Sequence, residues 1–216
     1  MIRLYSYWRS SSAWRVRLGL AWKRVTHELV LVDLVRDGGE QNRPEFRQRN
    51  PLGQVPVLEV SAAGQELRLT QSVAILEYLE ERFPERPLLP RSTEDRARVR
   101  QFVEIVNSGM QPFHNLGLRR AFEAAHTDPL PYMQGAIARG LDALEALATT
   151  TAGRYLVRDG VTLADMYLIP QLYNARRFHV ELGPYPTLLR VEGECNALGE
   201  FQSAHPNAQP DYDPNA

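Results

Sequence analysis

Three consecutive serines, Ser10, Ser11 and Ser12, have the residue type and position that most clearly allow chemistry in this chain. They lie between a short apolar segment and a run with the pattern of an amphipathic helix, and no cysteine lies among them. Serine hydroxyls and backbone N–H groups at the first turn of a helix, at the positive end of its dipole, can bind an anion or a thiolate. Any thiol chemistry here must therefore use the sulfur of a ligand.

A simpler interpretation is that Ser10 or Ser11 only caps the helix. Serine is among the preferred N-cap residues of helices in general. The serine run by itself leaves both interpretations open, so the other segments must decide between them.

The composition is that of an ordinary globular protein. The 216 residues are 44% hydrophobic, and 25 Lys and Arg balance 26 Asp and Glu to a net charge of −1. This balance gives no sign of a nucleic-acid partner or an acidic membrane partner, so any anion must be bound locally.

The single cysteine, Cys195, excludes an internal disulfide and a cysteine-based metal cluster. One cysteine also fits a reducing compartment, and no apolar run has the length of a membrane span. The five histidines lack the spacing of metal ligands. We therefore expect a cytoplasmic protein with no metal and no membrane association.

The first part of the chain predicts a small α/β domain. Strand-like segments at Ile2–Tyr7 and Thr26–Asp33 flank a helical segment at Trp14–Trp22, which favours a parallel pair. Ligands of α/β proteins bind at the carboxyl ends of such strands, where the serines follow the first strand. The order then continues as two strands and a helix, with Val55-Pro56 at a strand entrance, a turn at Ala63-Gly64, a strand at Leu67–Thr70 and a helix at Val73–Arg82.

The rest of the chain has helical periodicity. A proline-rich stretch at Pro84–Pro90 predicts a linker between domains 1–84 and 90–216. Residues 205–216 are polar and contain proline, so we expect them to be poorly ordered. Thr162–Asp165 predicts a capping box with Asp in place of Glu. The expected helices are Thr93–Phe122, Leu130–Leu147, Leu163–Phe178 and Thr187–Ala197.

At this point the chain resembles the zeta class of cytosolic glutathione transferases, which includes maleylacetoacetate and maleylpyruvate isomerases. The resemblance runs nearly end to end and implies a thioredoxin-like first domain, an all-α second domain and a homodimer. It depends on residues 9–17 (RSSSAWRVR), Asn50-Pro51 through Gln54-Val55-Pro56, Gln71-Ser72, Gln111-Pro112, Thr162–Asp165, Arg177-Phe178 and Pro184–Pro186.

One departure from the family pattern concerns the third serine. The zeta class commonly reads Ser-Ser-Cys, and this chain has Ser12 in the third place. Because the family assigns stabilisation of the thiolate to a serine, the reaction should survive without that cysteine.

The resemblance also implies a glutathione site and the role of each residue in it. Ser11, or alternatively Ser10, donates a hydrogen bond to the glutathione sulfur, and a cis Pro56 holds the Val55 backbone for strand-like pairing with the cysteinyl part. Gln71 and Ser72 hold the γ-glutamyl end, and Gln41 reaches the glycyl end. The remaining implied contacts are the first helical turn, Ser12, Ala13, Trp14 and Arg15, together with Gln111 and Asn115 one turn apart in the second domain.

The second substrate would be chosen by arginines and by Gln111. Arg177 matches the zeta-class arginine that binds a substrate carboxylate, whereas Arg176 would point about 100° away on a helix. A guanidinium binds a carboxylate through two parallel hydrogen bonds, so we expect a dicarboxylic substrate. Arg9 is a candidate for another carboxylate, or else a solvated surface residue. His114 has no triad partner and is expected to lie in a cleft or interface.

Three functions are therefore open. The first is a glutathione-dependent cis–trans isomerase of maleylacetoacetate or maleylpyruvate that works by reversible thiolate addition. The second is a transferase that conjugates or dehalogenates small α-haloacids with the same thiolate. The third is a non-catalytic binding module, against which the complete set of thiol-ligand residues speaks.

Overall fold

The chain folds into two compact units. The structure, a computed structural model, describes residues 1–62 and 64–214. Unit 1 consists of Met1–Pro87 together with Leu198–Ala216, and unit 2 of Leu88–Ala197. None of the helices within the described ranges combines the length and the apolarity that a bilayer span requires.

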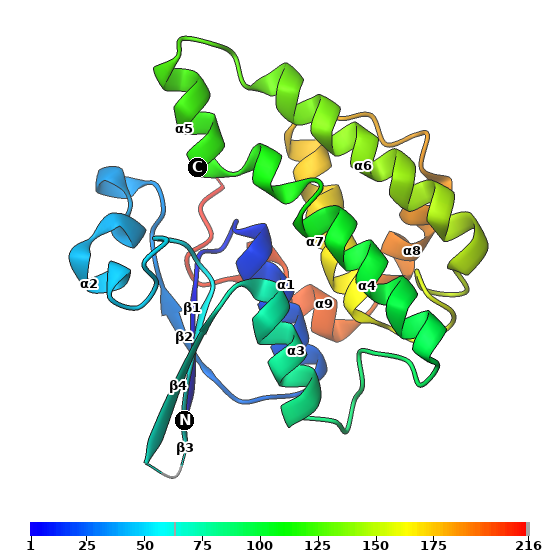
Figure 1. Cartoon of the computed structure of the whole chain (residues 1–216), viewed down its shortest axis with the longest axis horizontal. Coiled ribbons are helices and arrows are strands. Elements are labelled where there is room, and N and C mark those ends of the chain that lie inside the picture. Colours follow the sequence, from blue (N-terminus) through cyan, green and yellow to red (C-terminus); the bar gives the residue numbers. More distant parts are fainter. Residues whose placement is uncertain (63, 215–216) are drawn as a thin grey trace. The chain divides into compact units, whose positions relative to one another are not determined.

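Unit 1 is built on a four-stranded sheet (Figure 1). Strand β1 (Ile2–Ser6) pairs in parallel with β2 (Glu28–Leu31) and antiparallel with β3 (Val57–Ala62), which pairs antiparallel with β4 (Gln65–Thr70). The strand order β2-β1-β3-β4 confirms the predicted βαβ unit followed by two strands and a helix. Gly64 of the predicted turn has a φ of +77°, whereas Ala63 lies outside the described residues.

Helix α1 (Ser11–Trp22) is buried on nearly all sides, which corrects the prediction of an amphipathic helix. The side chains of Arg15 and Arg17 are 0% and 4% exposed, although their charge predicted a solvent-facing side. The other helices of the first part of unit 1 are the short α2 (Pro44–Arg47) and α3 (Ser72–Arg82). Helix α3 packs against α1 at Gly19, where a Cβ would lie 2.4 Å from a methyl group of Leu76.

The segment from Leu198, after α8 (Pro186–Asn196), belongs to unit 1, which differs from the predicted domain 90–216. Helix α9 (Gly199–Ala204) lies beside α1 (Figure 1). Residues 205–214 follow with a 3-10 turn at Pro206–Ala208 and with the Gln209 amide donating to the carbonyls of Ser203 and His205, both at 3.0 Å. The expectation of poor order in this segment is therefore wrong for residues 205–214. Its aromatic and carboxylate side chains supply contacts that its polar composition did not indicate.

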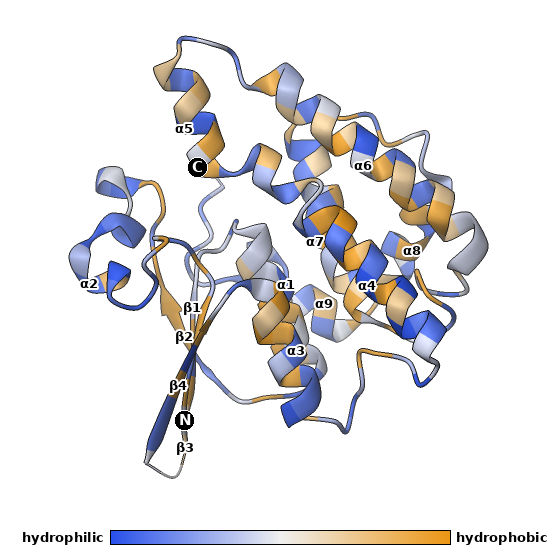
Figure 2. Cartoon of the chain, in the orientation of Figure 1, coloured by the Kyte–Doolittle hydropathy of each residue, from blue (hydrophilic) through white to orange (hydrophobic). Residues whose placement is uncertain are grey.

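Unit 2 contains five α-helices among its described residues: α4 (Thr93–Asn107), α5 (Leu116–Ala124), α6 (Leu130–Thr151), α7 (Leu163–Arg177) and α8 (Pro186–Asn196). Hydrophobic and hydrophilic residues are interleaved along α4 and α6 (Figure 2), as expected for helices with one face in a core. The single helix predicted over Thr93–Phe122 is wrong. It is divided by a 3-10 turn at Gln111–His114, where Gly109 and Pro112 weaken the α-helical hydrogen-bond ladder.

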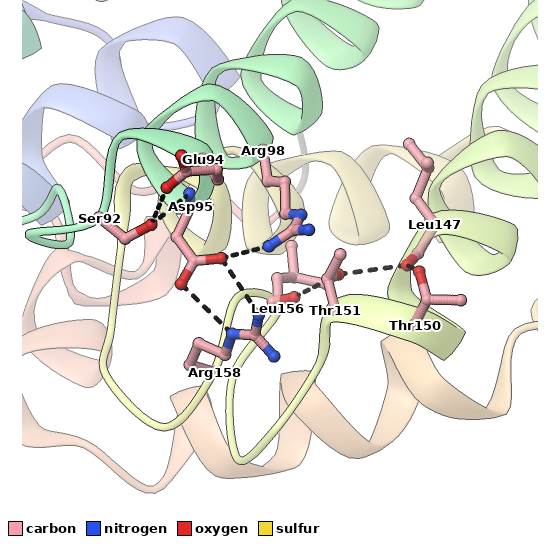
Figure 3. A network of polar contacts seen from close by, with 9 residues as sticks. All are labelled: Ser92, Glu94, Asp95, Arg98, Leu147, Thr150, Thr151, Leu156 and Arg158. Carbon is pink, nitrogen blue, oxygen red and sulfur yellow. Dashed lines mark hydrogen bonds and ion pairs between the residues drawn. The ribbon is translucent and has the colours of Figure 1, made fainter.

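Polar contacts fix the ends of two helices in unit 2 (Figure 3). The Ser92 hydroxyl caps α4 by accepting from the Asp95 amide at 3.3 Å, and the Asp95 carboxylate accepts from Arg98 and Arg158. At the end of α6, the Thr151 hydroxyl donates to the Leu156 carbonyl at 2.9 Å. These contacts hold the loop between α6 and α7 against the start of α4.

The predicted capping box at the start of α7 is confirmed. The fully buried Asp165 carboxylate accepts from the Thr162 amide at 2.7 Å and the Thr162 hydroxyl at 3.0 Å. Its other oxygen accepts from the Leu156 amide at 2.9 Å. One carboxylate therefore satisfies three buried donors and joins the preceding loop to the helix.

Replacing Asp165 by alanine should destabilise the protein strongly. The Asp165→Ala variant leaves the three donors without their acceptor, and we expect the free energy of unfolding to fall by about 2–4 kcal/mol. Chemical denaturation with far-ultraviolet circular dichroism measures this loss. An unchanged unfolding midpoint would contradict the role of the carboxylate.

Asp165→Asn is the matched control, because it keeps one acceptor oxygen and cannot titrate. Burial raises the pKa of the Asp165 carboxyl from 3.8 to about 6. Because the folded protein binds this proton more tightly than the unfolded chain, protonation of Asp165 stabilises the fold fully below pH 3.8, and this stabilisation is lost as the pH rises through about 6. Between these two pH values, the free energy of unfolding of the wild type should therefore fall relative to that of Asp165→Asn.

Candidate functional site at the start of helix α1

Ser10 and Ser11 have different surroundings, although they are neighbours in the chain. Ser10 is the N-cap of α1, and its hydroxyl accepts from the Ala13 amide at 3.2 Å. Ser11 is the first residue of the helix and is 8% exposed, and no described residue hydrogen bonds to its hydroxyl. The helix-capping interpretation therefore applies to Ser10, and Ser11 keeps its donor for a ligand.

The rest of the first helical turn contributes backbone groups. The amides of Ser11 and Ser12 have no acceptor within the helix because they belong to its first turn. The side chains of Ala13, Trp14 and Arg15 are buried inside unit 1, at 0%, 2% and 0% exposure. Among Ser12, Ala13, Trp14 and Arg15, which were predicted to contact glutathione, only Ser12 has a side chain that is partly exposed. The other three can contribute only their backbone groups.

The start of α3 forms a second polar corner of unit 1. Gln71, just before the helix, is an exposed residue with a φ of +69° and a ψ of 119°, which is uncommon for a residue with a Cβ. Such strain is concentrated at functional sites in proteins. Ser72 is 4% exposed, and its hydroxyl accepts from Nη1 of Arg15 at 3.4 Å. Arg15 thus links the start of α1 to the start of α3.

The Val55-Pro56 peptide bond is cis, as predicted. The Val55 side chain is buried in the core of unit 1, next to Val57 at the start of β3. No residue of the described chain hydrogen bonds to the Val55 amide or carbonyl. These two backbone groups are therefore available to pair with an extended peptide.

Gln41 lies inside its loop. It is 4% exposed, its amide nitrogen donates to the Leu34 carbonyl at 3.2 Å, and its amide oxygen has no partner among the described residues. Gly39, with a φ of +90°, makes room for it, because a Cβ there would lie 2.4 Å from the Gln41 amide. Gln41 therefore stabilises its own loop. This position does not itself favour the predicted contact with the glycyl end of glutathione.

Arg17 is a residue of the site that the sequence interpretation missed. Its buried guanidinium donates to the Ser6 hydroxyl at 2.9 Å, the Tyr7 carbonyl at 3.2 Å and the Trp8 carbonyl at 2.9 Å. Burial lowers its pKa to about 9. Its alternation with apolar residues is typical of an exposed side chain, and no local signal distinguishes a buried arginine from an exposed one. Arg9, in the loop between β1 and α1, is half-buried, and its guanidinium lies 5.1 Å from the centroid of the Trp8 ring.

The predicted residues of unit 2 are placed differently from the sequence interpretation. Gln111 begins a 3-10 turn, and Asn115 caps α5 by accepting from the Leu118 amide at 2.8 Å, so the two do not share one continuous helix. His114 is buried, with Nε2 3.1 Å from the Gln171 amide oxygen. It is a core residue, which corrects the expectation of a cleft or interface position.

Arg177 is the exposed last residue of α7, with its guanidinium 5.2 Å from the Phe178 ring. Arg176 points elsewhere, as predicted, and makes a bidentate ion pair with Glu192 that raises the pKa of Arg176. The two arginines therefore have separate surroundings within unit 2.

The other candidate groups for thiol or metal chemistry lie away from the serines in sequence. Cys195 is buried in unit 2, and burial raises the pKa of its thiol. Within residues 1–62 and 64–214, no three His, Cys, Asp or Glu side chains gather in a way that could hold a metal ion.

Comparison with known proteins identifies the family. Residues 1–81 match the model of the N-terminal domain of glutathione S-transferase. The chain is 44% identical over 208 residues to maleylacetoacetate isomerase of Rattus norvegicus, covering 96% of this chain and 94% of the relative. It therefore belongs to the glutathione transferase family, in the zeta class of the maleylacetoacetate isomerases.

Solved structures agree with this assignment. A maleylacetoacetate isomerase from Anaeromyxobacter dehalogenans with bound glutathione in its active site superimposes with a TM-score of 0.91 at 53% identity, covering 99% of this chain and 98% of that one. A maleyl pyruvate isomerase described as a zeta-class bacterial glutathione S-transferase gives a TM-score of 0.91 at 37% identity, with coverage of 98% and 100%. The predicted fold, a thioredoxin-like domain followed by a helical part, is confirmed.

The different surroundings of the two serines lead to a prediction. Ser11→Ala should raise the pKa of bound glutathione by about one to two units, because a hydrogen bond to a charged group contributes about 1.5–3 kcal/mol. Ultraviolet absorbance of the thiolate, titrated with pH, measures this pKa.

Ser10→Ala is the matched control. It removes the cap of α1 and should lower the free energy of unfolding by about 1 kcal/mol, with a smaller effect on the thiolate. If Ser11→Ala leaves the titration unaltered while Ser10→Ala shifts it, the assignment of the two serines is reversed.

Proposed function

We propose that this protein is a glutathione-dependent cis–trans isomerase of a maleyl keto acid, either maleylacetoacetate or maleylpyruvate. The observation that carries the proposal is the Ser11 hydroxyl, buried at the start of α1 and without a partner in the described chain. Its neighbour Ser10 already caps the helix. Relatives that match nearly the whole chain are maleylacetoacetate and maleylpyruvate isomerases.

The residues of unit 1 fit the binding of glutathione. The Val55 amide and carbonyl offer a donor and an acceptor to the backbone of its cysteinyl residue. The start of α3 offers the Ser72 amide and the positive end of a helix to the γ-glutamyl carboxylate. Gln71, exposed beside it, supplies an amide to the same end of the tripeptide.

Ser11 stabilises the reactive form of the thiol. Its hydroxyl donates to the sulfur, and the first-turn amides and helix dipole of α1 favour a negative charge at the same place. Bound glutathione supplies a thiolate that adds reversibly to the cis double bond, allows rotation about it and is released unchanged with the trans product. The chain itself has no thiol in this segment, because Ser12 stands where relatives commonly have cysteine.

Arginines are proposed to hold the acid substrate. Arg177 offers a planar guanidinium that can bind a carboxylate through two hydrogen bonds. Arg9, in the loop that leads to the serines, is the proposed second cation, and Gln111 is proposed to contact the same substrate. A preorganised cation also stabilises negative charge that develops on the substrate during the reaction.

A relative supports the choice of a dicarboxylic substrate. One structure of the Anaeromyxobacter dehalogenans isomerase contains dicarboxyethyl glutathione and citrate in its active site. Dicarboxyethyl glutathione is a thioether of the kind that forms when a thiol adds across the double bond of an unsaturated dicarboxylic acid. A site that binds it accommodates two carboxylates next to the sulfur.

The same thiolate could also displace halide from small α-haloacids, which is the second candidate function. It is favoured by the fact that displacement needs only the thiolate and one carboxylate contact.

The family resemblance further implies a homodimer in the cytoplasm, and both belong to this proposal. Light scattering after size-exclusion chromatography tests the dimer.

Substrate assays separate the candidate functions. We expect glutathione-dependent loss of absorbance with maleylacetoacetate or maleylpyruvate, without net consumption of glutathione, and slower turnover of chloroacetate. Turnover of chloroacetate alone would favour the transferase. Binding of glutathione without turnover of any of the three compounds would favour a non-catalytic module.

Arg177→Ala should reduce kcat/KM for the maleyl acid by about 10- to 100-fold, since a charge-assisted hydrogen bond contributes about 1.5–3 kcal/mol. Glutathione affinity, measured by calorimetry, should change little. Arg176→Ala is the neighbouring control. It removes the ion pair with Glu192 and should lower stability while leaving kcat/KM near that of the wild type. Equal losses of turnover and glutathione affinity in Arg177→Ala would contradict the role.

A further inference from the structure

The segment after α9 contacts the loop between β1 and α1. A carboxylate oxygen of Asp211 accepts a hydrogen bond from the Trp8 amide at 2.9 Å. The Tyr212 ring packs edge-on against the Trp8 ring, with centroids 5.0 Å apart and planes at 87°. Trp8 is 4% exposed and lies two residues before Ser10. Residues more than 200 positions apart in the sequence thus meet next to the serine run.

The same loop is held from inside unit 1 by Arg17. Its guanidinium donates to the carbonyls of Tyr7 and Trp8, and its Nε donates to the Ala204 carbonyl at 3.2 Å. The Ser10 amide closes the loop by donating to the Tyr7 carbonyl at 3.1 Å. Three backbone groups in succession, the Tyr7 carbonyl and the Trp8 amide and carbonyl, are therefore fixed before the helix begins.

Asp211 holds one of these three backbone groups, the Trp8 amide, from the segment after α9. The negative charge of Asp211 also raises the pKa of the Arg17 guanidinium and so partly offsets the lowering by burial. Around the loop, the charged or titratable groups include Tyr7, Arg9, Arg17, Asp33, His205, Asp211 and Tyr212. His205 packs on Trp14 of α1, with ring centroids 5.2 Å apart, so the segment touches the helix as well as the loop.

We propose that Asp211 is a positioning residue for the reaction, which holds the loop before α1 so that the Ser11 hydroxyl points at the thiolate. The inference rests on the proposed function, because it assigns the thiolate to Ser11. Asp211 acts through the hydrogen bond to Trp8 and does not touch the substrate. Its own negative charge would disfavour a nearby thiolate, so geometry and charge predict opposite effects when it is removed.

The test compares Asp211→Ala and Asp211→Asn in the full-length protein. In Asp211→Ala the Trp8 amide loses its acceptor, and we expect the pKa of bound glutathione to rise and kcat/KM to fall by about tenfold near neutral pH. The loss should shrink at alkaline pH, where the thiol ionises without help. Asp211→Asn keeps an acceptor oxygen and should restore most of the wild-type pH profile. Asn207→Ala, an exposed change in the same segment, is the control and should leave the profile unchanged.

Each other outcome has a definite meaning. A rate loss in Asp211→Ala that is equal at all pH values would assign Asp211 to stability alone and overturn the inference. A fall in the thiolate pKa in both variants would mean that the charge acts and the hydrogen bond does not, which also overturns it. A wild-type protein that neither binds glutathione nor isomerises maleyl acids would instead contradict the proposed function itself, and the inference with it. Thermal unfolding of each variant checks that it is folded.

Discussion

The buried guanidinium of Arg17 is the constraint around which the serine-bearing loop is organised. An uncompensated charge inside a protein is costly, so the chain must bring acceptors to it. Those acceptors are the carbonyls of Tyr7, Trp8 and Ala204 and the Ser6 hydroxyl. Because the first two lie directly before α1, satisfying Arg17 also determines where that helix starts. The third brings the C-terminal segment to the same place.

In this arrangement Ser10 and Ser11 have different roles. Ser10 satisfies the helix and Ser11 is left with an unused hydroxyl at the positive end of the helix dipole. A sulfur placed there meets a donor and several backbone dipoles, and the only cysteine of the chain is buried in the other unit. The proposed chemistry accordingly depends on a thiol supplied by a ligand and on a loop held by hydrogen bonds to Arg17.

Much of unit 1 could be predicted from local patterns. The strand and helix periods of unit 1 follow from residue types within a few positions, as does the Thr162–Asp165 capping box of unit 2. The cis Val55-Pro56 bond was predicted from the family resemblance. The errors share a cause in long-range packing. The alternation of Arg17 with apolar residues is typical of an exposed side chain, whereas its acceptors are contributed by the loop and by Ala204, 187 positions away. The polar composition of the segment 205–214 predicts poor order, but the segment is held by Trp8 and Trp14 at the other end of the chain.

The candidate site was predictable in the same partial way. The serine run and the Gln71-Ser72 pair can be named as candidates from sequence, and they stay predictions. The distinction between Ser10 and Ser11 requires the cap geometry. The measurement that tests the central claim most directly is the titration of glutathione bound to the unmodified protein, followed by thiolate absorbance. The account predicts a pKa clearly below that of free glutathione. A bound thiol that titrates like the free one would contradict the role of the α1 N-terminus and of Ser11.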